Sequence, residues 1–340
     1  PSQAQLALVN WVKLLMSEQI SLQAEVPTDL GGKRLDQVLA QLFPDYSRSR
    51  IKTWILDDKI TVDGEIFNTP REKLLGGEVV AVETTIEAPR EYEAQDIKLN
   101  IVYEDDDILV INKPMGLVVH PGAGNPDGTV LNALLHHFPD IINVPRAGIV
   151  HRLDKDTTGL MVVAKTIQAQ THLVKALQKR ENFTREYEAL CNGTMTAGGM
   201  VEKAIGRHPT QRTHMAVHEM GKPAITHYRV AEKFRAHTRL RLRLETGRTH
   251  QIRVHMAYLN HPLIGDQSYG GRPRPPKGAT PELFELLRSF KRQALHAVKL
   301  SIAHPITGEM MTWQAPIPDD MVQMTQALRE DTKANPDIAS

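Results

Sequence analysis

The chain has 340 residues, 41% of them hydrophobic, a size that suits one large domain and one small one. Its single cysteine, Cys191, excludes an internal disulfide and a cysteine-based metal cluster, and a reducing cytoplasm is expected. The net charge of +1 excludes a uniformly polycationic protein, and the apolar stretch over residues 6–16 is too short to predict a membrane span.

The charges are nevertheless segregated along the chain. Residues 205–255 contain eleven Lys and Arg against three Glu, which is a local net charge of +8. Such a segment is typical of a surface that binds a polyanion, although a solvated charged surface is the simpler alternative.

The first methionine is Met16, and the sequence that follows it is typical of a natural start. Residues 1–15 are therefore expected to be an upstream extension. Residues 16–82 are expected to form a small module. Its first helix has an apolar face and ends at Pro44; the face consists of Leu35, Val38, Leu39 and Leu42.

Two further signals complete this module. Ser47 is expected to cap a second helix over residues 49–55. Asp63 and Gly64 predict the turn of a hairpin over residues 60–66, and a last strand is expected over residues 79–82.

The order helix, helix, hairpin, strand resembles the S4 RNA-binding domain. The resemblance implies that basic residues of the module contact RNA; we expect these to be Arg34, Arg48, Arg50 and Lys52. The last three lie at the start of the second helix, where the helix dipole adds to their attraction for phosphate. The alternative is that they are ordinary exposed cations.

Residues 83–98 are acidic and lack a clear period, so a linker is expected there. A larger domain is expected over residues 99–328. Strand-like runs occupy residues 101–103, 108–111 and 117–119, and leucines alternate with charges over residues 239–245. No βαβ repeat is present, so the predicted class is α+β with a mixed, largely antiparallel sheet and flanking helices. Residues 329–340 are expected to form a flexible tail.

The stretch from His151 to Leu160 places Asp154 among cations and hydroxyls. Apolar runs flank it at residues 147–150 and 160–164, which predicts strand, polar turn and strand, a common way to hold a site. A charged turn that only satisfies backbone amides is an equal alternative. The glycine-rich residues 112–124 lack the Gly-Lys-Ser/Thr ending of a nucleotide triphosphate loop.

Two other segments are candidates. Tyr187 lies in a strand-like run that begins at Thr184, where a core position is the simpler interpretation. Gly247 is expected to make a turn, and Thr249 to cap a helix that runs to about Leu259 and carries Arg253.

Together with residues 261–266 and 295–297, these strings resemble the RluA-type pseudouridine synthases, in the order of that family. The resemblance implies that Asp154 is the essential catalytic residue, that Tyr187 stacks on the target base and that Arg253 pairs with Asp154. An arginine fork would hold this carboxylate in one geometry and keep it ionised. Further RNA contacts are expected from Arg152, Lys113 and Arg248.

The implied activity is the isomerisation of specific uridines to pseudouridine in large-subunit (23S) ribosomal RNA, with the uridine flipped out of its stack. Such an isomerisation requires no cofactor and no metal. The expected partner is ribosomal RNA, either free or within an assembling subunit, and the expected state is a cytoplasmic monomer.

Two alternatives stay open at this point. One is a non-catalytic RNA-binding ribosome assembly factor with the same fold. The other is a metal-dependent nuclease, suggested by the fifteen histidines and by the pairs His214/His218 and His250/His255, although no His-Glu-x-x-His pattern occurs.

Overall fold

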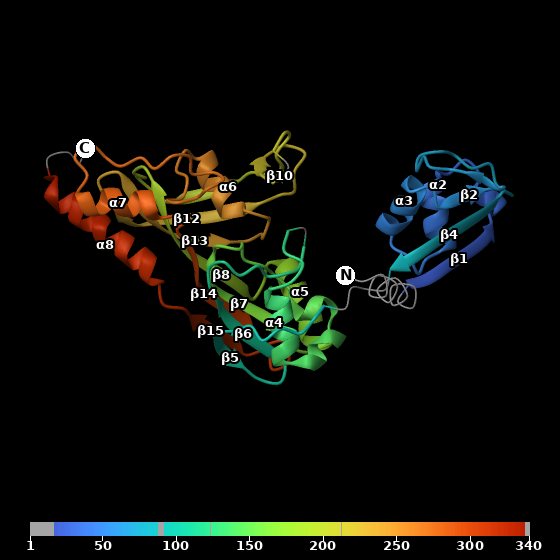
Figure 1. Ribbon diagram of the computed structural model, residues 1–340, viewed down its shortest axis with the longest axis horizontal. Helices are drawn as coiled ribbons and strands as arrows, with labels where there is room; N and C mark the ends of the chain where they lie inside the picture. Colours follow the sequence, from blue (N-terminus) through green and yellow to red (C-terminus); the bar gives the residue numbers. More distant parts are fainter. Residues whose placement is uncertain (1–16, 88–91, 123, 212, 337–340) are drawn as a thin grey trace, which may run out of the picture. The chain divides into compact units, whose positions relative to one another are not determined.

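The computed structural model describes residues 17–87, 92–122, 124–211 and 213–336, so the expected extension over residues 1–15 lies outside the described residues. Two compact units divide the chain between Glu91 and Tyr92, and Figure 1 shows both. Helices and sheets occur in each unit, which confirms the predicted α+β class. No helix in the described ranges is both long and apolar enough to cross a membrane.

The first unit is a four-stranded antiparallel sheet packed against two helices. The sheet order is β1-β4-β2-β3, and the strands are β1 (Ser17–Glu25), β2 (Ile60–Val62), β3 (Glu65–Ile66) and β4 (Val79–Glu87). A short 3-10 turn, η1 (Thr28–Leu30), precedes the helices α2 (Leu35–Leu42) and α3 (Arg48–Leu56). One cluster of buried side chains joins both helices to the sheet.

Local signals in this unit act as predicted. The Ser47 hydroxyl accepts a hydrogen bond from the Arg50 amide and caps α3. Asp63 and Gly64 have φ of 50° and 87°, as the tight turn between β2 and β3 requires.

The limits of the first unit differ from the prediction. The strand β1 was not predicted; it pairs with β4 over its whole length, from Ser17 opposite Glu87 to Glu25 opposite Val79. The linker predicted from residue 83 is therefore wrong for residues 83–87, because these residues continue β4. Their acidic character had hidden the strand.

The second unit is built on a nine-stranded sheet in the order β5-β6-β7-β14-β8-β13-β12-β9, with β15 added beside β14. In the first half of the unit the strands are β5 (Ile101–Glu104), β6 (Ile108–Lys113), β7 (Thr158–Ala164), β8 (Phe183–Asn192) and β9 (Gly199–Glu202). In the second half they are β12 (Ile225–Lys233), β13 (His237–Leu244), β14 (Leu295–Ala303) and β15 (Met310–Gln314). The strands β10 (Ile205–Arg207) and β11 (Met215–Val217) form a separate hairpin.

This sheet is mixed and largely antiparallel, as predicted. β14 pairs with β7 in parallel, and it pairs with β8 and β15 in the antiparallel sense. The leucines of β13 are buried while its arginines are more exposed, which confirms the amphipathic strand.

Helices cover both faces of the sheet. Alternate residues of β6 and β7 join two different cores, one that includes α4 and α6 and one that includes α5. A further core joins α7 and α8 to the sheet. The helices are α4 (Val130–His137), α5 (Ile167–Lys179), α6 (Gln251–Tyr258), α7 (Pro281–Ser289) and α8 (Asp319–Ala334), with the 3-10 turns η2 (Pro139–Asn143) and η3 (Pro145–Gly148) after α4.

Three expectations for this unit are wrong. Residues 117–119 form no strand. Residues 147–150 form no strand either, because η3 reaches Gly148 and only Ile149 bridges to Val163. The predicted tail begins too early, because α8 continues to Ala334 and its buried Asp331 pairs with Arg235.

Candidate active site

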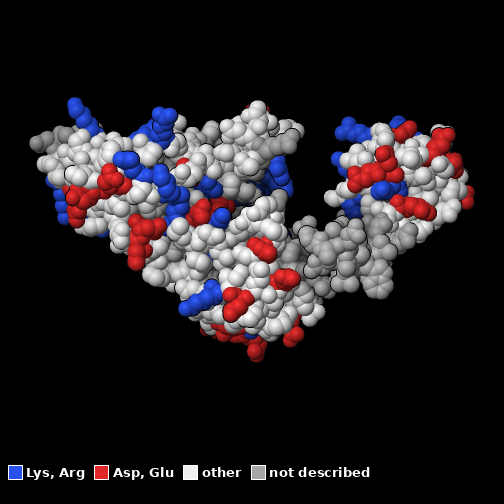
Figure 2. Space-filling model, in the orientation of Figure 1, with Lys and Arg blue, Asp and Glu red and all other residues white. Residues whose placement is uncertain are grey.

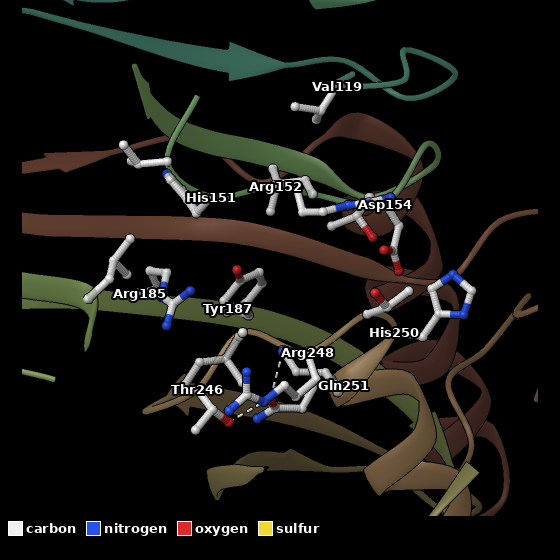
Figure 3. Close-up of a pocket in the computed structure, with 18 of the residues that line it drawn as sticks. Val119, His151, Arg152, Asp154, Arg185, Tyr187, Thr246, Arg248, His250 and Gln251 are labelled. Carbon is white, nitrogen blue, oxygen red and sulfur yellow. Dashed lines mark hydrogen bonds between the residues drawn. The ribbon is translucent and has the colours of Figure 1, made fainter. Parts of the chain in front are cut away.

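The candidate site is an open pocket of about 540 Å³ in the second unit. Segments far apart in the sequence supply its walls: the loop before β7, the start of β8, and the turn between β13 and α6. Figure 3 shows that the side chains of Asp154 and Tyr187 both face this pocket. The structure therefore brings to one pocket two residues that the sequence analysis expected in one site.

Asp154 lies in the loop that joins η3 to β7. Its backbone carbonyl accepts a hydrogen bond from the Thr157 amide at 3.1 Å, which closes a tight turn. Its side chain is 17% exposed, and Oδ2 accepts a hydrogen bond from Nη1 of Arg253 at 3.1 Å. The predicted pair of Asp154 and Arg253 is therefore present, and the carboxylate is open to the pocket.

Arg253 is held by a second carboxylate. Its Nε and Nη2 donate to Oδ2 and Oδ1 of Asp266 at 2.7 and 2.9 Å. Burial opposes ionisation of both groups, but these hydrogen bonds outweigh it. They hold the pKa of Arg253 above its ordinary value and the pKa of Asp266 below its ordinary value. The guanidinium thus remains charged and presents one edge to Asp154.

Asp266 and Tyr269 fix this arginine in place. The backbone amides of Ser268 and Tyr269 donate to Oδ1 of Asp266 at 2.9 and 3.0 Å. The Tyr269 ring lies 5.1 Å from the Arg253 guanidinium carbon, and its hydroxyl is 2.7 Å from Nδ1 of His250. The string over residues 261–266 was a family match, but no role for Asp266 could be predicted from it, since nothing local in the sequence links Asp266 to Arg253.

The turn before α6 differs from the prediction. Thr249 does not cap this helix: the cap position is His250, which has φ of 57° and no side-chain cap. The Gln251 side chain organises the turn instead. Its Oε1 accepts from the Arg248 amide at 3.0 Å and from the Thr246 hydroxyl at 2.7 Å.

Tyr187 lies on β8, opposite Ala297 of β14 and Leu242 of β13. It is 4% exposed, and burial raises the pKa of its hydroxyl. A neutral ring fixed in the middle of a sheet is a suitable surface on which a planar base can stack.

The His151 side chain holds the loop that carries Asp154 against the strand β7. Its Nε2 accepts a hydrogen bond from the Val162 amide at 3.0 Å, and its ring packs edge-on against Phe183. Burial lowers the pKa of His151 to about 3, with a smaller contribution from Arg185, so the ring is neutral and Nδ1 carries the proton.

The pocket is strongly cationic. Two carboxylates contribute to its wall, Asp154 and Glu245, against six arginines: Arg146, Arg152, Arg180, Arg185, Arg248 and Arg253. Arg152 is exposed, and Arg248 donates from Nε to the Pro223 carbonyl at 2.9 Å. Figure 2 shows further Lys and Arg side chains gathered on the part of this unit that contains β12, β13 and the C-terminal helices.

Lys113 is not placed for the RNA contact expected of it. It is 1% exposed, and its ammonium donates to the backbone carbonyls of Pro114, Leu117 and Lys155 at 2.8 to 2.9 Å. Burial lowers its pKa to about 7. Lys113 therefore ties the loop after β6 to the loop that carries Asp154.

The four basic residues of the first unit that were expected to contact RNA lie on α3 and just before α2. Arg48, Arg50 and Lys52 are exposed on α3. Arg34 is different, because it donates from Nε and Nη2 to both oxygens of Asp36 at 3.0 and 2.5 Å. Its charge is thus largely balanced within the unit.

The histidine pairs behind the nuclease alternative do not gather metal ligands. Within the described ranges, one group has metal-compatible spacing, and it consists of Asp105, Asp107 and His304. His214 and His218 flank the strand β11 and do not lie on a helix.

Comparison with known proteins agrees with this geometry. Residues 107–258 match the model of the RNA pseudouridylate synthases, and residues 33–80 match the S4 domain. The chain is 67% identical over 318 residues to the ribosomal large subunit pseudouridine synthase D of Yersinia pestis, covering 94% of this chain and 98% of that protein. It is 67% identical over 313 residues to the protein of the same name from Haemophilus influenzae, covering 92% and 96% of the two chains.

A solved structure extends the comparison to the fold. The human RNA pseudouridylate synthase domain containing 4 aligns with a TM-score of 0.52 and 25% sequence identity. The alignment covers 68% of this chain and 93% of the human one.

Proposed function

The chain belongs to the family of RNA pseudouridylate synthases, and we propose that it isomerises uridine to pseudouridine in large-subunit ribosomal RNA. One observation carries the catalytic part of this proposal. The Asp154 carboxylate lies 3.1 Å from Nη1 of Arg253 and faces a cationic pocket that Tyr187 also lines.

The pocket favours an extruded nucleotide. A uridine inside a structured RNA must leave its stack, at a cost of a few kcal/mol. Stacking on the buried ring of Tyr187 would return about 1–3 kcal/mol. Contacts between phosphates and the guanidiniums of the exposed Arg152 and the half-buried Arg248 would offset more of this cost.

Asp154 would act at the sugar of the flipped nucleotide. Arg253 keeps the carboxylate in one position, while the 17% exposure of the side chain leaves room for the ribose. In one route the carboxylate bonds to C1′, and in the other it accepts the proton of C2′. Both routes break the bond between C1′ and N1, rotate the base and join C5 to C1′. In the first route the new bond to C5 displaces the carboxylate from C1′, and in the second the carboxyl group returns the proton to C2′. C5 then loses its proton and N1 gains one.

The first unit would bind RNA through α3. Arg48, Arg50 and Lys52 lie in the first half of this helix, where the helix dipole favours phosphate. Arg34 and Lys113 are left out of this proposal, because Asp36 neutralises the first and three carbonyls bury the second. We further propose that the protein acts in the cytoplasm, where the bacteria of its relatives make their ribosomes. A monomer, the state expected from the sequence, is proposed with it.

The test is the variant Asp154→Asn, assayed by tritium release from ribosomal RNA labelled at C5 of uridine. We expect RNA binding close to that of the unsubstituted protein and no tritium release. Asp156→Asn is the matched control, two residues away in the same loop, and should retain the rate. Normal turnover by Asp154→Asn would refute the assigned role. An absence of release by the unsubstituted protein would instead favour the assembly-factor alternative.

A further inference from the structure

Arg185 is a buried cation that has no partner in the part of the chain that the structure describes. It lies on β8, two residues before Tyr187, and is 7% exposed. Among the described residues its guanidinium forms no hydrogen bond or ion pair, and its buried Nε has no acceptor. A buried charge of this kind is costly unless an anion or an acceptor joins it.

The guanidinium is held in place by packing. Its carbon lies 5.7 Å from the centre of the Phe183 ring, in contact across the face. On another side lies Gly247, where an added Cβ would come within 2.8 Å of Nη1. Figure 3 shows the guanidinium pointing along the pocket toward Tyr187.

The carboxylates of the pocket are already engaged. Asp154 accepts from Arg253, and Glu245 accepts from His227 and Arg180. Burial lowers the pKa of Arg185, which shows the cost of the unpaired charge. The missing anion must therefore come with the substrate.

We propose that Arg185 is a further catalytic residue, which stabilises the negative charge that develops on the uracil ring. This assignment rests on the proposed function. When the bond between C1′ and N1 breaks, its electron pair stays on the base and spreads to the ring nitrogens and carbonyl oxygens. After C5 has bonded to C1′, C5 loses its proton and N1 gains one, so the charge is transient and no atoms are gained or lost. A fixed cation beside this charge acts as an oxyanion hole does.

The position of Arg185 favours the base over a phosphate. Arg185 is next to the stacking ring and almost fully buried, whereas the exposed Arg146 and Arg152 are available at the same pocket for the backbone. Phosphates of a flipped nucleotide remain on the outer side, since the chain continues into bulk RNA. The buried guanidinium of Arg185 is therefore better placed to contact the base, which enters the pocket, than a phosphate.

The experiment compares Arg185→Met with Arg185→Lys in single-turnover reactions at saturating enzyme. We expect the rate with Arg185→Met to fall by about 100- to 1000-fold, as for the loss of one oxyanion-hole donor. RNA affinity should stay within about threefold, because the contact is made chiefly in the transition state. Arg185→Lys should recover part of the rate. Arg288→Met is the control, an exposed arginine on α7 outside the pocket.

A second substrate makes the test specific for charge on the base. In RNA that carries 5-fluorouridine, fluorine withdraws electrons and itself stabilises the negative ring. The defect of Arg185→Met, measured as loss of 5-fluorouridine after nuclease digestion and mass spectrometry, should therefore be smaller than its defect on uridine. An equal defect on both substrates would overturn the proposal.

Two further outcomes would also overturn it. One is a rate within threefold of the unsubstituted protein; the other is a loss confined to RNA affinity, which would make Arg185 a phosphate contact. If Arg185→Met does not fold, Gly247→Ala displaces the guanidinium without removing it and should lower the rate in the same assay. The unsubstituted protein, run in parallel, separates this proposal from the proposed function. An absence of turnover by the unsubstituted protein would refute the proposed function, whereas the outcomes above, with normal turnover by the unsubstituted protein, would refute the role of Arg185 alone.

Discussion

Asp266 acts on the reaction through Arg253, so the change Asp266→Asn tests whether the geometry of the ion pair matters. The Asp266 side chain is 0% exposed and accepts two hydrogen bonds from Arg253. It accepts two more from the amides of Ser268 and Tyr269. Asn keeps the shape, but it removes the charge and turns one acceptor into a donor that faces other donors.

The expected effect on stability is large. Breaking a buried ion pair by removing one partner costs about 3–5 kcal/mol, and Asp154 still pairs with Arg253, so we expect about 3 kcal/mol. For a domain of this size, each kcal/mol lowers Tm by about 2–4 °C, which gives about 6–12 °C. The released guanidinium would also shift against Asp154, and a displacement of about 1 Å can reduce kcat by about 100-fold.

The assay combines thermal unfolding with kcat and KM for ribosomal RNA below the lowered Tm. Asp331→Asn is the matched control, because Asp331 makes the same two-fold contact with Arg235 and both side chains are 3% exposed. We expect the control to lose similar stability and to keep its kcat. Equal kcat values for the two variants would refute the positioning role of Asp266, whatever their Tm.

Two further predictions concern pH and RNA affinity. The folded pKa of His151, about 3, lies below its unfolded value of 6.5, so the unfolded chain binds the extra proton and stability falls as pH drops through 6.5 toward 3. At pH 5 the protonation of the unfolded chain lowers the free energy of unfolding by about 2 kcal/mol relative to pH 8. His151→Gln should therefore show a flatter dependence of unfolding free energy on pH. An unchanged dependence would contradict a neutral, buried His151. Joint replacement of Arg48, Arg50 and Lys52 by Ala should weaken RNA binding and reduce the slope of log affinity against log salt by about 2–3, with the single-turnover rate unchanged. A Lys59→Ala control should bind normally, and an unaltered slope in the triple variant would exclude α3 from the RNA contact.

Much of the fold was readable from the sequence because its signals are local. Ser47, Asp63 and Gly64 act within a few residues, and the alternation over residues 239–245 reports which side of β13 is buried. The strand β1 was not predicted, since its partner β4 lies more than fifty residues away in the sequence. The length of both strands depends on their pairing with each other, which no local signal reports.

The residues of the site were predictable only where the resemblance to a family assigned them roles, because local sequence does not show which distant residues meet. Asp154, Tyr187 and Arg253 were expected together, and they line one pocket. Asp266 and Arg185 had no role assigned, because burial and an absent partner are properties of the folded chain. Lys113 shows the opposite error: a lysine in a polar loop motif looks like an RNA contact, yet three carbonyls enclose it.

The place of β14 in the sheet decides when the enzyme can first work during its synthesis. β14 is inserted between β7, which follows Asp154, and β8, which carries Tyr187. Because Leu295–Ala303 is translated long after both, the two strands lack their shared neighbour until the ribosome has made most of the chain. We therefore expect a nascent chain that emerges close to ribosomal RNA to remain inactive until that late segment has been released and has paired.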